Sequence, residues 1–247
     1  MGKPDFTRIA MFSGPRNIST TMLRAFENRD DAVVFDEPFY ACYLKDSGAP
    51  HPMREEILAA QLTAWEKVIE QLNSPLPGDA AISFQKHIAF HFAEGAPLEW
   101  LEGAKVFHLI RDPRAMVASY RNKYDDVTPI IDSLKLQRRI YEDAEANGAP
   151  CPIVDSEGIQ KNPEGMLRAL CAALDIPFSK KMLSWPAGPR DSDGVWGPHW
   201  YDAVISSTGF RPHQEKTIKL TPAHEEIAET CRPDYNFFYE RRLRAAS

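Results

Sequence analysis

Residues 9–21 read Ile9-Ala10-Met11-Phe12-Ser13-Gly14-Pro15-Arg16-Asn17-Ile18-Ser19-Thr20-Thr21. The apolar run at 8–12 is typical of a buried strand, and residues 20–29 follow it as a helix-like stretch. A strand that leads through a tight turn into a helix presents backbone N–H groups at the helix N-terminus, where the helix dipole favours an anion. The segment therefore predicts a phosphate-binding loop at the end of the first strand.

The residue types in the turn fit this chemistry. Gly14 and Pro15 allow a tight bend, and Arg16 adds a fixed positive charge that suits phosphate or sulfate oxygens. Hydroxyl donors follow at Ser19, Thr20 and Thr21. A plain turn with a Ser or Thr helix cap is the alternative interpretation.

The loop does not match the Walker A pattern of P-loop ATPases. That pattern needs Gly-Lys directly before the Ser or Thr, whereas Asn17 and Ile18 stand there. One feature favours such an enzyme, because residues 33–37 read Val-Val-Phe-Asp-Glu, like a Walker B strand that ends in acids. A magnesium-dependent P-loop kinase or NTPase that uses Asp36 therefore stays open as an alternative.

Strand-like and helix-like segments alternate along the chain. Apolar runs at 8–12, 32–35, 80–84, 105–110 and 152–154 are separated by helix-like stretches at 20–29, 55–72, 115–124, 130–147 and 163–174. This order predicts an α/β fold with a parallel central sheet of about five strands and helices on both faces.

Length and composition favour one soluble domain over residues 1–247. We expect a core at about 7–178, a loop region rich in Trp, Pro and Gly at 184–213, and a C-terminal helix at 222–243. The net charge of −6 argues against nucleic acid as a partner but allows a small anionic ligand.

The chain shows no signal peptide and no apolar run long enough to span a membrane. Its four cysteines are scattered, with no metal-ligand spacing, and are expected to be free thiols in a reducing compartment. We therefore expect a cytoplasmic protein without a metal site.

A second motif lies at the end of the fourth predicted strand. The strand ends in Arg111, Pro113 opens a helix, and Ser119 lies eight positions after the arginine. Here the sequence resembles the sulfotransferases that use 3′-phosphoadenosine 5′-phosphosulfate (PAPS), whose 3′-phosphate site is an Arg at a strand end with a Ser eight positions later. Their 5′-phosphosulfate loop often reads Pro-Arg/Lys-Ser-Gly-Ser/Thr-Thr, and residues 15–20 read Pro-Arg-Asn-Ile-Ser-Thr.

The resemblance runs from about residue 7 to 178 and is closest to bacterial-type members. It implies a three-layer P-loop NTPase-like fold, PAPS as co-substrate, 3′-phosphoadenosine 5′-phosphate (PAP) as product, and no metal. It implies that the loop Gly14, Pro15, Arg16, Asn17, Ile18, Ser19, Thr20 and Thr21 binds the 5′ end of the donor, and Arg111 and Ser119 its 3′-phosphate. Two positions depart from the family pattern, since Ile18 replaces a glycine and Thr21 replaces the tryptophan that stacks on adenine in cytosolic members. Arg211 is a weak candidate for the family's C-terminal basic loop.

The resemblance also implies roles in catalysis. Arg16 would stabilise the charge on the leaving phosphate, and Glu37, at the end of the second strand, would be the general base. His87 and His91 are second choices for the base, and Lys86 is a candidate to contact the sulfuryl group. A non-catalytic nucleotide-binding relative remains a further alternative.

The acceptor is expected to be a small molecule that offers a hydroxyl or an amine. Its pocket is expected under the 38–54 loop, with help from the tail. Seven aromatic residues are candidates to line it: Phe39, Tyr40, Tyr43, Trp185, Trp196, Trp200 and Tyr201.

Overall fold

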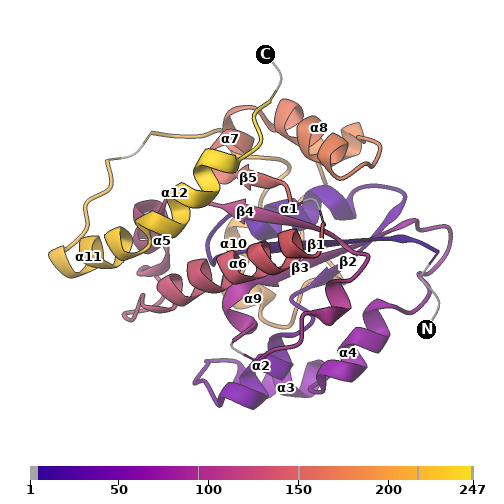
Figure 1. Ribbon diagram of the computed structural model, residues 1–247, viewed down its shortest axis with the longest axis horizontal. Coiled ribbons are helices and arrows are strands. Elements are labelled where there is room, and N and C mark those ends of the chain that lie inside the picture. The colour runs from indigo at the N-terminus through magenta and orange to yellow at the C-terminus, as the bar shows by residue number, and fades with distance from the viewer. Residues whose placement is uncertain (1–4, 94, 150, 216, 246–247) are drawn as a thin grey trace.

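The apolar runs that the sequence marks as strands pair into one parallel sheet with the strand order β2-β3-β1-β4-β5 (Figure 1). The computed structural model describes residues 5–93, 95–149, 151–215 and 217–245. The strands are β1 (Thr7–Ser13), β2 (Ala32–Asp36), β3 (Ile82–Ile88), β4 (Lys105–Ile110) and β5 (Ile153–Asp155). The predicted α/β fold is confirmed.

Alternate residues of β1 face opposite sides of the sheet and define its two apolar layers. Ile9 and Met11 pack with α1 (Ser19–Glu27), α8 (Pro163–Ala173) and the short helix η3 (Lys180–Leu183). Ala10 and Phe12 pack with α4 (Trp65–Leu72), η2 (Glu99–Leu101) and α6 (Pro129–Ala146). Because helices cover both faces, the molecule has the three layers that the sequence predicts.

β3 continues four residues beyond its predicted end at 84. Residues Gln85–Ile88 pair with β1, from Ala10 opposite Gln85 to Ser13 opposite Ile88. The sequence did not predict this extension, because Gln85, Lys86 and His87 are polar and interrupt the apolar run. Lys86 therefore stands inside a strand next to the end of β2, where its register partner is Asp36.

The predicted helix at 55–72 is wrong, because the chain forms α3 (Arg54–Ala60) and α4 with an extended link at residues 61–64. Gln61 leaves the helix to accept a hydrogen bond from the backbone N–H of Ala41 and to donate one to the carbonyl of Glu37. These two contacts fix the start of α2 (Tyr40–Ser47), which the sequence pattern did not reveal.

The C-terminal helix expected at 222–243 is two helices, α11 (Pro222–Thr230) and α12 (Arg232–Arg241). Pro233 lacks an N–H donor and stands where a continuous helix would need one. In Figure 1 the two helices run along α5 (Pro113–Tyr120), α6 and the β5 edge of the sheet.

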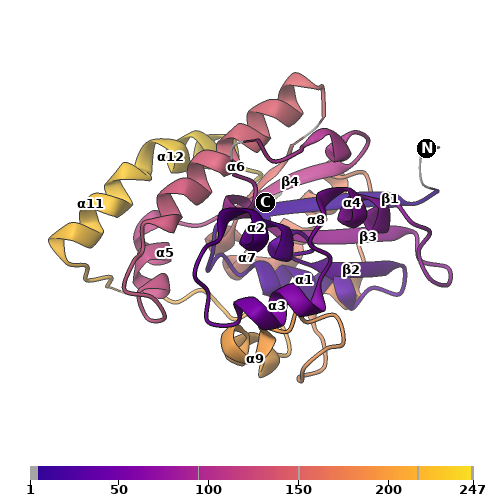
Figure 2. The same cartoon turned by 90° about the horizontal axis from the view of Figure 1, so that it is seen from below.

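The region at 184–213 contains two short helices, α9 (Gly197–Trp200) and α10 (Asp202–Ile205). α9 lies beside α3 (Figure 2), and one apolar cluster joins Ile57 of α3 to Trp196, Tyr201 and Val204. The remaining elements are η1 (Ala89–His91) and α7 (Ser156–Lys161). Among the described residues, no helix has both the length and the apolar character needed to cross a membrane.

Candidate active site

One cavity of about 280 Å³ opens at the carboxyl ends of β1, β2, β3 and β4. It is lined by most of the predicted site residues, and only Gly14 and His87 are not in its wall. The predicted residues in the wall are Pro15, Arg16, Asn17, Ile18, Ser19, Thr20, Thr21, Glu37, Lys86, His91, Arg111, Ser119 and Arg211.

A buried hydrogen bond to β4 anchors the loop after β1. The buried side chain of Asn17 donates a hydrogen bond of 3.1 Å to the carbonyl of Leu109 in β4. Gly14 packs closely against α5, because an added Cβ would lie 2.5 Å from the Cε of Met116, and the end of that flexible side chain would have to move. Gly14 thus shapes the loop from outside the cavity wall.

Ile18 begins α1 in a left-handed conformation, with φ of 58° and ψ of 21°. A β-branched residue rarely adopts positive φ, whereas glycine does so freely. This geometry explains why a glycine suits the position. The Ile18 side chain provides no cap hydrogen bond to α1, and the first N–H groups of a helix have no intrahelical partner.

Two guanidinium groups meet beside this helix end. Arg16 donates from Nε to the Ser119 hydroxyl at 3.2 Å, and Arg111 donates from Nη1 to the Arg16 carbonyl at 2.5 Å. Neither arginine forms a salt bridge within the described residues. Burial lowers the pKa of both guanidinium groups, and each adds its charge to the same part of the cavity. Two neighbouring cations of this kind produce a positive potential that favours an anion.

The position of Arg111 and Ser119 follows from local sequence. Asp112 caps α5 by accepting hydrogen bonds from the N–H groups of Arg114 and Ala115, and Pro113 occupies the first turn. Asp112 also pairs with Arg232 of α12 at 2.7 Å. The helix therefore starts directly after Arg111, and Ser119 lies two turns along it.

A buried ionic cluster forms the floor of the cavity at the ends of β2 and β3. The ammonium group of Lys86 donates to Asp36 Oδ1 at 2.7 Å, to Glu37 Oε1 at 2.6 Å and to the Tyr201 hydroxyl at 2.9 Å. Tyr201 in turn donates to Asp36 Oδ2 at 2.7 Å and accepts from Trp196 Nε1 at 2.8 Å. The cluster thus joins the sheet to the region at 184–213.

Burial raises the pKa of the Glu37 carboxyl, and the charge of Asp36 adds to this effect, while the charge of Lys86 opposes it. Burial by itself would lower the pKa of Lys86, but Asp36, Glu37 and Tyr201 raise it well above its ordinary value. Lys86 is therefore an ammonium ion at neutral pH.

The two candidate histidines occupy different environments. His91 lines the cavity with Nδ1 3.9 Å from Glu37 Oε2, and burial and the charge of Lys86 lower its pKa well below the ordinary value. His87 lies in the apolar layer on the α4 side, where its ring stacks 5.0 Å from Phe12 and packs against Trp100. The structure thus places His87 outside the cavity, because successive residues of a strand point to opposite faces.

Aromatic side chains form a further part of the cavity wall. Of the seven aromatic candidates, Tyr40, Trp196, Trp200 and Tyr201 line the cavity. Phe39 and Trp185 pack instead in the two apolar layers, and Tyr43 stacks on His91 outside the wall. Sequence reasoning missed Phe90, Tyr120, Tyr124, Gln160 and Phe210, which also line the cavity.

Arg211 lines the cavity beside Phe210, and its guanidinium donates to the carbonyl of Ala203 at 2.9 Å. The part of the chain that the structure describes contains no cluster of three or more His, Cys, Asp or Glu residues that could hold a metal ion.

A family model described as a sulfotransferase domain matches residues 7–240. The chain belongs to the sulfotransferase family. Solved sulfotransferases share the fold. The enzyme from Alicyclobacillus acidocaldarius aligns over 98% of both chains, with a TM-score of 0.60 and 13% identity. Mouse sulfotransferase SULT7A1, solved in complex with PAP, aligns over 96% of this chain and 90% of its own, with a TM-score of 0.56 and 14% identity.

Two curated relatives of this chain come from Arabidopsis thaliana. Branched-chain-amino-acid aminotransferase-like protein 2 is 37% identical over 92% of this chain and 40% of its own length. Branched-chain-amino-acid aminotransferase-like protein 1 is 35% identical over 96% of this chain and 42% of its own length. The chain thus spans about two fifths of the relatives that it matches.

Proposed function

We propose that this sulfotransferase moves the sulfuryl group of PAPS to a hydroxyl or amine of a small acceptor, with Glu37 as general base. The observation that carries the proposal is the arrangement of two guanidinium groups, Arg16 and Arg111, beside the start of α1, with the carboxylate of Glu37 in the same cavity. Neither arginine forms a salt bridge to another described residue. Anionic donor and proton acceptor thus have sites within one space.

The donor would lie with its two anionic ends on two motifs. The N–H groups at the start of α1, with Arg16, Ser19 and Thr20, would bind the 5′-phosphosulfate. Arg111 and Ser119 would bind the 3′-phosphate. The contact of 3.2 Å between Arg16 and Ser119 supports this assignment, because it places the two motifs side by side in one cavity.

The transfer would proceed by in-line displacement. The acceptor oxygen or nitrogen forms a bond to sulfur as the bond between sulfur and the bridging phosphate oxygen breaks. That electron pair leaves with the 5′-phosphate of PAP, whose charge Arg16 stabilises, and the acceptor proton passes to Glu37. No step in this scheme needs a metal ion.

The acceptor would occupy the aromatic side of the cavity. Tyr40, Tyr120 and Tyr124 carry no positive charge there. Their ring faces and hydroxyl groups suit a small organic acceptor.

The four cysteines are free thiols, and three of them are buried, which supports a reducing, cytoplasmic setting for this chemistry.

A magnesium-dependent kinase or NTPase is the weaker candidate. It would use Asp36 as a metal ligand, but Asp36 is 7% exposed and its two carboxylate oxygens already accept hydrogen bonds from Lys86 and Tyr201.

The deciding experiment is incubation of the protein with PAPS and a pool of metabolites in the presence of EDTA. Mass spectrometry should find an acceptor that gains SO₃, together with an equal amount of PAP. Hydrolysis or binding of the nucleotide donor that strictly requires magnesium would favour the kinase or NTPase alternative. PAP binding without transfer to any member of a broad pool would favour a non-catalytic relative.

A further inference from the structure

Among the described residues, Lys86 is the one ammonium group in the cavity wall, and its surroundings differ from those of Arg16 and Arg111. We infer that Lys86 acts through Glu37, holding that carboxylate in its ionised form, and that Asp36 is the counter-charge that keeps Lys86 buried. Lys86 then does not contact the transferred sulfuryl group, which other residues bind. The inference rests on the proposed function, since it concerns the base of that reaction.

The first argument is the count of donors. A lysine ammonium has three N–H donors. All three are used, by Asp36 Oδ1, Glu37 Oε1 and the hydroxyl of Tyr201, at distances between 2.6 and 2.9 Å. The side chain of Lys86 is also 1% exposed. A sulfuryl oxygen would have to displace one of these partners to reach it.

The second argument is the position of Glu37. One carboxylate oxygen, Oε1, is held by Lys86, and the other, Oε2, lies 3.9 Å from His91 Nδ1 on the cavity side. The backbone is fixed as well, because the Glu37 N–H donates to the Lys86 carbonyl and Gln61 donates to the Glu37 carbonyl. No described residue donates a hydrogen bond to Oε2, so Oε2 is the atom placed to accept a proton.

The third argument is the role of Asp36. A buried ammonium is costly unless it is paired. Asp36 supplies the pair, and its own Oδ2 accepts hydrogen bonds from Tyr201 and from the backbone N–H of Gly194. The carboxylate of Asp36 is thus fully occupied as a partner, whereas Glu37 keeps one oxygen free.

The groups that face Glu37 set its titration. They are the ammonium of Lys86, the carboxylate of Asp36, the imidazole of His91 and the phenols of Tyr40, Tyr124 and Tyr201. At neutral pH the histidine and the phenols carry no charge, because burial lowers the pKa of His91 and raises the pKa of each phenol. One positive and one negative neighbour remain, so removal of each should move the Glu37 titration in opposite directions.

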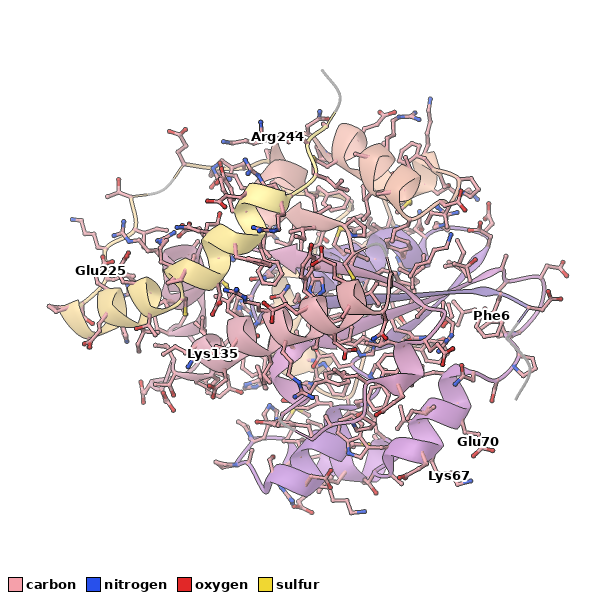
Figure 3. All side chains as sticks on the ribbon, viewed as in Figure 1. Phe6, Lys67, Glu70, Lys135, Glu225 and Arg244 are labelled. Atoms are coloured by element: carbon pink, nitrogen blue, oxygen red, sulfur yellow. The ribbon has the colours of Figure 1, made fainter. Side chains whose placement is uncertain are left out.

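The test is direct titration of the Glu37 side-chain carboxyl by ¹³C NMR in the full chain, with the signal identified by its loss in Glu37→Gln. Lys86→Met should raise the Glu37 pKa by about one unit or more, and Asp36→Asn should lower it, since neighbouring charges at this distance act on that scale. Lys67→Met is the matched control, because it removes a surface lysine of α4 that pairs with Glu70 at 2.8 Å (Figure 3). It should leave the Glu37 titration unchanged.

A binding measurement separates the two roles of Lys86. PAP and PAPS differ by the sulfuryl group, so Lys86→Met should weaken the binding of both ligands by the same factor. A loss of ten-fold or more for PAPS alone would overturn the inference, as would an unshifted Glu37 titration in Lys86→Met. If that variant does not fold, the downward shift in Asp36→Asn decides, and its absence overturns the inference. Wild-type protein that binds neither PAP nor PAPS would instead count against the proposed function.

Discussion

The guanidinium of Arg111 donates a hydrogen bond of 2.5 Å to the backbone carbonyl oxygen of Arg16. This contact links the end of β4 to the loop after β1, two segments that are 95 positions apart in the sequence. The spacing between the two proposed phosphate sites is therefore fixed by the protein before a ligand binds. An anion bound at one site should therefore stabilise the arrangement of the residues that form the other site.

The first prediction concerns Arg111→Ala. We expect PAP binding to weaken about 100-fold, because a charge-assisted hydrogen bond to a phosphate is lost. Binding of adenosine 5′-monophosphate should weaken less than about tenfold, since it loses only the support of the Arg16 carbonyl. Calorimetric titration measures both affinities. Arg114→Ala, which removes a neighbouring arginine that pairs with Glu225, is the control. Equal losses for the two nucleotides would refute the 3′-phosphate assignment.

The second prediction concerns the general base. Glu37→Gln should keep PAP binding within about twofold, because the side chain keeps its shape, and should slow transfer by about 10² to 10⁴. His91→Gln should retain more activity, since burial and the charge of Lys86 lower the pKa of His91 and make it a weak base. The rates are measured with the acceptor found in the metabolite screen. Full activity of Glu37→Gln would move the base to a histidine.

The parts of the site that could be predicted from sequence are those built from local contacts. Arg111, the Asp112–Pro113 helix start and Ser119 lie within one strand-to-helix junction, so their spacing alone fixes their geometry. The same holds for Arg16 and the start of α1. The Tyr201 contact with Asp36 spans 165 positions and leaves no such periodic signal.

The fold was predictable where apolar periodicity was uninterrupted. The prediction failed where a tertiary contact overrides local preference. Gln61, for example, interrupts a helical pattern because its side chain forms hydrogen bonds with the backbone of Ala41 and Glu37. The prediction also failed at Gln85–Ile88, because a strand that places Lys86 at the site must have polar residues within the sheet. Both errors lie next to Glu37, where functional geometry departs from local sequence rules.

The third prediction concerns acid stability. His87 and His108 are buried, and neither ring has a hydrogen-bond partner among the described residues. Burial lowers the pKa of each imidazole to about 3. Between about pH 6.5 and pH 3 the unfolded chain binds protons that the folded chain does not, so stability falls as pH falls.

The effect of each histidine should be visible by substitution. His87→Phe or His108→Phe should reduce the acid slope of the unfolding free energy by about 1.4 kcal/mol per pH unit in this window. Urea denaturation at several pH values measures the slope. Leu62→Ala, at an exposed position that carries no titratable group, should leave the slope unchanged. Wild-type slopes in both buried variants would show that neither histidine controls acid unfolding.

The last prediction concerns Ile18, whose φ of 58° places a β-branched residue in the left-handed region. Alanine keeps that strain and loses the contacts of the isoleucine side chain with the apolar layer. Glycine loses the same contacts but removes the strain, which is about 1–2 kcal/mol for a residue with a Cβ. Ile18→Gly should therefore be more stable than Ile18→Ala, the reverse of the usual order inside a helix. At Lys135, an exposed position within α6 (Figure 3), the usual order should hold, with glycine less stable than alanine by about 1 kcal/mol. Thermal and urea unfolding of the four variants measures both differences, and the same order at both positions would show that the loop does not hold Ile18 in this conformation.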